Sequence, residues 1–226
     1  MLKMKGFYSM LPVSILRNAT LTKELNDDWN RVAPLTFMYD EIVSQEDLNK
    51  TSEEIRKYYF GDQSISNLTE KNLADLYSDR FFVYPVQRAA KLYAQHGAPT
   101  YLYLFSYAGE YTNVNETPGN PKKIVTHGDD IQYLLHANFR AEFPVDSVSA
   151  QIVGRYNGLW ASFAATGVPN ATWGNALTWP QLGQNSTNGN ATWYRIETET
   201  ALVQEPFYER MKFWETLPLT KLEEKA

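Results

Sequence analysis

Cysteine is absent from this sequence of 226 residues. The chain therefore has neither disulfide bonds nor thiolate metal ligands, and a chain of this length can bury a core without them. Histidine is scarce as well, because the sequence holds only His96, His127 and His136, which are too dispersed for a zinc-binding motif. A glycine-rich phosphate loop after a strand is also missing. We therefore expect neither a metal site nor a cofactor.

Positive charge is limited too. Lys and Arg number 21 against 26 Asp and Glu, which gives a formal net charge of -5. Because the basic residues are scattered, we expect no nucleic-acid partner and no attraction to an anionic membrane surface. No apolar run approaches the roughly 20 residues of a membrane span. The hydrophobic content of 43% excludes an intrinsically disordered chain.

Glycosylation sequons, by contrast, are abundant. Chance predicts about two or three Asn-x-Ser/Thr sites in such a composition. The sequence has seven, at Asn18, Asn49, Asn67, Asn115, Asn170, Asn185 and Asn190. They favour a secreted glycoprotein, the alternative being chance accumulation in Asn- and Thr-rich loops. Residues 1–5 lack the apolar core and cleavage site of a signal peptide, so we expect the entry signal in an upstream part of the protein.

Periodicity and boundary residues predict a mixture of helices and strands. Helices are expected over residues 52–59, 67–81, 86–95, 146–166 and 206–216. The aromatic-rich residues 99–107 predict a strand buried on both faces, and residues 193–196 predict another. Helices that alternate with a buried strand indicate an α/β fold, and so few strands represent only the end of its sheet.

Two of these helices have a clear apolar face. Residues 67–81 place Leu68, Leu73, Leu76 and Phe81 at helical spacing. In residues 146–166, Asp146 is the expected N-cap and Gly167 the expected stop. The apolar stripe of this longer helix consists of Ile152, Val153, Tyr156, Leu159, Trp160 and Phe163.

His127 is the residue best placed for chemistry. It lies in a loop between the strand that ends near Tyr107 and a new amphipathic stretch. Loops that follow buried strands are where α/β enzymes carry catalytic groups. His96, at a helix C-terminus, and His136, after an apolar run, are better explained as structural residues. Position alone leaves a structural role open for His127 as well.

Several motifs around His127 resemble one known family. Residues 125–134, VTHGDDIQYL, resemble the His-Gly-x-Asp/Glu segment of type-B carboxylesterases and cholinesterases. Residues 160–170, WASFAATGVPN, resemble the Trp-x-x-Phe-Ala-x-x-Gly-x-Pro-Asn signature of that family, and Trp179–Pro180 matches its next landmark. The strand 101–105 resembles the one that leads to the catalytic histidine loop. Within the family, the sequence resembles insect esterases of the juvenile-hormone-esterase and venom types.

The resemblance implies an α/β-hydrolase fold, a mostly parallel central sheet flanked by helices, with residues 1–226 as the C-terminal portion of a single incomplete domain. It further implies a serine nucleophile, a supporting acid and a histidine in that chain order, so His127 would be the triad histidine. The sequence has no Gly-x-Ser-x-Gly motif, and Lys5–Gly6 stands where the family has an acid before glycine. We therefore expect that an N-terminal remainder completes the site.

On this interpretation the substrate is a small-molecule carboxylic ester. Asp130 would support the His127 loop, and Trp160 and Phe163 would pack the long helix. Two alternatives remain open from the sequence. The first is a non-catalytic adhesion or binding domain, since the family includes members that keep the fold and lose the triad. The second is a small, independently folding secreted binding domain.

Overall fold

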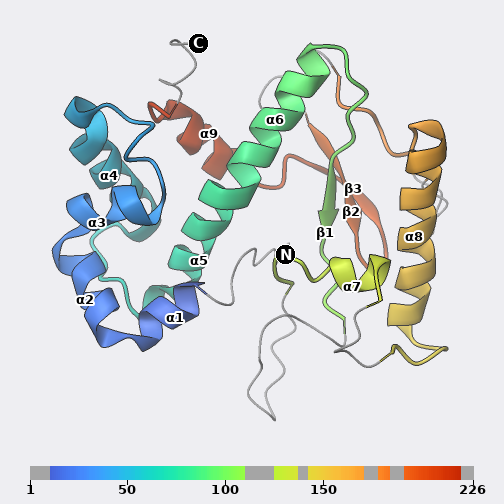
Figure 1. Ribbon diagram of the computed structural model, residues 1–226, viewed down its shortest axis with the longest axis horizontal. Helices are drawn as coiled ribbons and strands as arrows, with labels where there is room; N and C mark the ends of the chain where they lie inside the picture. Colours follow the sequence, from blue (N-terminus) through green and yellow to red (C-terminus); the bar gives the residue numbers. More distant parts are fainter. Residues whose placement is uncertain (1–10, 110–124, 137–141, 171–177, 184–190, 220–226) are drawn as a thin grey trace. The chain divides into compact units, whose positions relative to one another are not determined.

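A computed structural model describes residues 11–109, 125–136, 142–170, 178–183 and 191–219, and it has the expected mixture of helices and strands (Figure 1). The chain divides into two compact units. We call residues 1–4 and 86–208 the sheet unit, and residues 5–85 and 209–226 the helical unit. In the described part of the chain, no helix is both long and apolar enough to cross a bilayer.

The sheet unit is built on three strands in the order β1-β2-β3. Their bounds are Tyr103–Phe105 for β1, Thr192–Ile196 for β2 and Ala201–Gln204 for β3. Strands β1 and β2 are parallel, with Tyr103 opposite Tyr194, whereas β2 and β3 are antiparallel. The predicted strand 99–107 is thus correct only at its centre, the strand predicted at 193–196 is confirmed, and β3 was not predicted.

Helix α8, Val148–Thr166, connects the two parallel strands, as parallel pairing requires. Gly167 ends it in the left-handed conformation, with φ of 74°, as predicted. The predicted N-cap is wrong by one residue, because the side chain of Ser147, not of Asp146, accepts a hydrogen bond from the Ala150 N–H. The described part of the unit also contains two shorter helices: α6, Tyr84–Gln95, which begins in the helical unit, and α7, Ile131–Leu134.

The helical unit contains a series of helices, of which the first three were not predicted. They are α1 Leu11–Arg17, α2 Ala19–Asp27, α3 Trp29–Thr36, α4 Gln45–Phe60, the 3-10 turn η1 Asn67–Thr69, α5 Glu70–Ser78, the π-helical segment η2 Asp79–Val83 and α9 Tyr208–Thr216. The predicted final helix is confirmed in α9, which begins at the end of the sheet unit.

Two predictions in the helical unit need correction. The helix predicted at 52–59 begins earlier, at Gln45, because the Ser44 side chain accepts from the Asp47 N–H and caps it there. Leu68 was placed on the apolar face of the next helix but is 96% exposed. The 3-10 turn η1 interrupts the helical spacing at this point. Of the four residues predicted for the apolar face, only Leu73 and Leu76 are fully buried.

A network of charged and aromatic groups is buried in the helical unit. The Asp79 carboxylate is fully buried and accepts a hydrogen bond from the Tyr59 hydroxyl at 2.6 Å. Arg210, from α9, reaches the same carboxylate oxygen with Nε at 3.1 Å and Asp75 with Nη1 at 2.9 Å. The Trp214 indole N–H donates to the Tyr59 hydroxyl at 2.7 Å. The network therefore links α9 to α4, α5 and the residues that follow α5.

Candidate active site

The turn that carries His127 is held together by its own short-range hydrogen bonds. The Asp129 carboxylate accepts from the Thr126 N–H at 2.7 Å and from the Thr126 hydroxyl at 2.9 Å, and the Asp129 N–H donates to the Thr126 carbonyl. Gly128 has φ of 79°, which a residue with a side chain rarely adopts. Asp129 and Thr126 are buried, whereas His127 between them is exposed. The turn thus presents the histidine to solvent on a fixed backbone.

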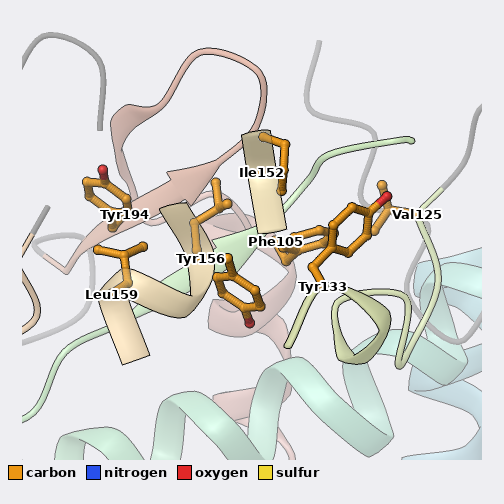
Figure 2. Packing of buried hydrophobic residues seen from close by; sticks show 8 residues of the cluster. Phe105, Val125, Tyr133, Ile152, Tyr156, Leu159 and Tyr194 are labelled. Atoms are coloured by element: carbon orange, nitrogen blue, oxygen red, sulfur yellow. The ribbon is translucent and has the colours of Figure 1, made fainter. Parts of the chain in front are cut away.

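The residues on either side of this turn anchor it at the carboxyl end of β1. Val125 precedes the turn and Tyr133 follows it, and both belong to the apolar cluster that includes Phe105, the last residue of β1 (Figure 2). The rings of Phe105 and Tyr133 lie 5.3 Å apart. The carboxyl ends of parallel strands are where α/β folds place their functional groups. His127 therefore occupies the position expected of a catalytic residue in such a sheet.

Asp130 connects the turn to the long helix. Its carboxylate accepts a hydrogen bond from the Tyr156 hydroxyl of α8 at 3.1 Å. The Tyr103 hydroxyl of β1 lies 3.3 Å from that of Tyr156. Burial raises the pKa of both tyrosines, and their proximity to Asp130 adds to the rise. Both hydroxyls therefore stay protonated, and so able to donate, at neutral pH.

Trp160 and Phe163 lie on α8 beside an aromatic-lined cavity. Trp160 packs edge-to-face against Tyr103 at 6.0 Å, and Phe163 packs in the same way against Tyr101 at 6.1 Å. Both side chains nevertheless remain partly exposed, at 41% and 38%. The cavity has a volume of about 90 Å³ and is lined by Tyr101, Tyr103, Tyr156, Leu159, Trp160, Phe163, Pro169, Trp179 and Ile196.

The other two histidines are not brought to this site by any described contact. His96 is exposed in the turn that follows α6, and His136 is exposed shortly after α7. Among the residues that the structure describes, no three His, Asp or Glu side chains gather closely enough to hold a metal ion. A histidine on such a turn can accept and return a proton when a hydroxyl nucleophile is placed beside it.

The predicted glycosylation sites lie in different settings. Asn18, Asn49, Asn67 and Asn170 are exposed. The Asn18 side chain is the N-cap of α2, and the sequon partners Thr51 of Asn49 and Thr69 of Asn67 are buried. Asn115, Asn185 and Asn190 fall outside the described residues. Of the sequons in the Asn-rich stretch after α8, the structure thus describes the setting of Asn170 but not that of Asn185 or Asn190.

Comparison with known proteins decides the family. The model of the carboxylesterase family matches residues 7–214, nearly the whole chain. The chain belongs to the carboxylesterase family. The resemblance drawn from the residues around His127 and Trp160 is thereby confirmed.

Insect esterases are among the relatives of this carboxylesterase-family chain. It is 34% identical over 169 residues to Esterase FE4 of Myzus persicae, covering 72% of this chain and 29% of the relative. Juvenile hormone esterase of Heliothis virescens is 33% identical over 73% of this chain and 29% of its own length. Venom carboxylesterase-6 of Apis mellifera is 24% identical over 96% of this chain and 38% of its own length. The chain thus spans about a third of the length of the curated relatives that it matches.

Sequence reasoning missed two residues that hold the His127 turn in the structure. Asp129 carried no expectation, and Tyr156 was only a member of an apolar stripe. Their hydrogen bonds depend on which groups lie next to them in the folded chain. The partner of the Tyr156 hydroxyl is Asp130, which is 26 residues away in the sequence. For Asp129 a signal was available, because a carboxylate three residues after Thr126 can close a turn on the Thr126 N–H.

Proposed function

We propose that this chain is the C-terminal portion of an α/β-hydrolase domain that hydrolyses small-molecule carboxylic esters, with His127 as general base and general acid. The observation that carries the proposal is that His127 is exposed on a hydrogen-bonded turn at the carboxyl end of β1. Membership of the carboxylesterase family supports it, as do relatives such as the carboxylic ester hydrolase of Bombus ignitus. On this proposal the sheet unit and the helical unit belong to one domain.

The reaction proceeds by acyl transfer in two steps. His127 removes the proton from a serine hydroxyl while the serine oxygen attacks the ester carbonyl, and it then gives that proton to the departing alkoxide. In the second step His127 takes a proton from water, the resulting hydroxide attacks the acyl-serine, and the proton returns to the serine oxygen. The sequence has no Gly-x-Ser-x-Gly motif. The serine and its acid therefore come from an N-terminal remainder of the domain.

The division of the site between two parts of the protein can be tested directly. Residues 1–226 alone are expected to show no turnover of a chromogenic short-chain ester above background, because no nucleophile is in place. The full-length gene product is expected to turn the ester over and to lose this activity with a covalent serine reagent. Reagent-sensitive turnover by residues 1–226 would contradict the proposed division. A well-folded full-length product without turnover would favour the non-catalytic binding domain instead.

We also propose that the protein is secreted and N-glycosylated. The seven sequons support this proposal, and so does the exposure of Asn170 at the end of α8. An acceptor asparagine must reach the glycosylating enzyme, and exposed positions beside loops are the most accessible.

Glycosylation is expected to appear as a loss of mass after digestion of the secreted protein with an N-glycosidase. In full-length protein from insect cells, the peptide containing Asn170 should carry one glycan. Both Asn170→Gln and Thr172→Ala should remove it, since each destroys the same sequon by a different change. An unmodified Asn170 peptide in secreted protein would contradict this assignment, and absence of the protein from the medium would contradict secretion.

A further inference from the structure

The tyrosine that bonds to Asp130 and the tyrosine beside it come from different elements of the sheet unit. Tyr156 projects from the middle of α8 and is only 1% exposed, and Tyr103 is the first residue of β1. Burying a hydroxyl costs free energy unless it finds a partner, and a phenylalanine would fill nearly the same volume at no such cost. Packing alone therefore does not account for a tyrosine at position 156, whereas the hydrogen bond to Asp130 does.

We propose that Tyr156 is a positioning residue for His127, which acts by holding Asp130 and with it the histidine turn against α8. The inference rests on the proposed function, because it assumes that His127 is the proton carrier. It adds a link from the core of the long helix to the catalytic turn.

The need for such a link follows from the hydrogen bonds of the turn itself. The bonds between Thr126 and Asp129 fix the shape of the turn, but because they lie within it they do not by themselves orient it on the sheet. Asp130 is the residue at which the turn passes into α7, three positions after His127. A tether at this point limits rotation of the turn about its anchor in the apolar core.

A second tether between α7 and α8 lies farther from the histidine. The Asn157 side chain donates to the Tyr133 carbonyl at 2.8 Å and so holds the middle of α7. The Asp130 link holds the N-terminal side of the same short helix. With both links the helix is fixed at two points, and loss of the Tyr156 hydroxyl leaves the end nearest to His127 free to shift.

The expected consequence is a change in kcat rather than in substrate binding. Small misplacements of a catalytic group, of about 1 Å, can cost on the order of 100-fold in rate. For Tyr156→Phe we expect about a tenfold lower kcat with KM within about twofold, because the Asn157 link still holds the middle of α7. The double variant Tyr103→Phe/Tyr156→Phe removes both hydroxyls of this cluster and is expected to lose at least as much as Tyr156→Phe.

The experiment uses the full-length gene product and a short-chain ester, with the thermal midpoint recorded for every variant. Tyr194→Phe is the matched control, since it removes a buried tyrosine hydroxyl from the neighbouring strand β2 and should leave kcat unchanged. In an Asp130→Ala background, Tyr156→Phe should lower kcat no further, because its target is gone. An equal loss in both backgrounds would mean that Tyr156 acts only through packing and would overturn the inference.

His127→Ala separates this inference from the proposed function. If His127→Ala retains activity, the catalytic role of the histidine fails and the positioning role fails with it. If His127→Ala is inactive while Tyr156→Phe and the double variant keep kcat within about twofold of the parent, the proposed function stands and the positioning role of Tyr156 is wrong.

Discussion

Alanine at position 127 is expected to remove nearly all ester hydrolysis from the full-length protein. Without the imidazole, no group takes the serine proton or returns it to the leaving alcohol. Loss of a triad member lowers kcat by on the order of 10⁴ to 10⁶, about 5 to 8 kcal/mol of transition-state stabilisation. The side chain is exposed, so its removal leaves no cavity in the core and the protein should fold normally. Steady-state kinetics with a chromogenic ester measure the effect.

The other two histidines provide matched controls. His96 and His136 are exposed like His127, but neither lies on the hydrogen-bonded turn formed by residues 126–129. Their alanine variants should keep kcat within a few fold and alter stability by about 1 kcal/mol at most, as ordinary surface substitutions do. Near-normal turnover in a folded His127→Ala protein would show that the turn is not the catalytic one, and a non-catalytic binding function would then explain the family resemblance better.

The largest effect on stability is expected from Arg210. In Arg210→Met, the aliphatic stem is largely retained, but the buried Asp79 carboxylate loses its cation. Removal of one partner from a buried ion pair typically costs about 3 to 5 kcal/mol, because the remaining charge stays desolvated. Chemical denaturation of the full-length protein at pH 8 measures the loss in the free energy of unfolding.

Arg31→Met is the matched control, because Arg31 also pairs with two carboxylates in the helical unit. Its partners Glu24 and Asp28 are solvent-exposed, and the Arg31 side chain is itself 58% exposed. Such surface pairs contribute little to stability, because water and salt screen them. If the two methionine variants lose similar amounts of stability, the Arg210 network is not the buried anchor that its geometry indicates.

The cost of Arg210→Met should also depend on pH. Burial raises the pKa of Asp79 from 3.8 to about 7, although Arg210 and the Tyr59 hydrogen bond oppose the rise. The folded protein thus binds the Asp79 proton more tightly than the unfolded chain, so the contribution of Asp79 to stability falls as pH increases from about 4 to 7. At pH 5 the Asp79 carboxyl group is neutral, so removal of the Arg210 charge leaves no buried carboxylate without a cation. We therefore expect a smaller loss at pH 5 than at pH 8, and an equal loss at both would contradict the raised pKa.

Much of the local structure was determined by the sequence alone. The periodic apolar residues and Gly167 defined α8 to within two residues at each end, and the family motifs identified His127 as the residue of interest. These signals are local, since a cap or a helical turn involves residues at most four positions apart. Errors at this level were small, such as Asp146 in place of Ser147, because neighbouring polar residues compete for one cap.

Other features were decided only when distant parts of the chain came together. Pairing of β1 with β2 joins residues about 90 positions apart, and Arg210 meets Asp79 across 131 positions. Tyr156 looked like one more apolar residue of α8 until folding placed its hydroxyl beside Asp130. Which polar groups meet depends on how the whole core packs, and a one-dimensional pattern does not contain that information. The sequence thus singled out His127 as the candidate for chemistry, and the tertiary structure determined which residues lie against its turn.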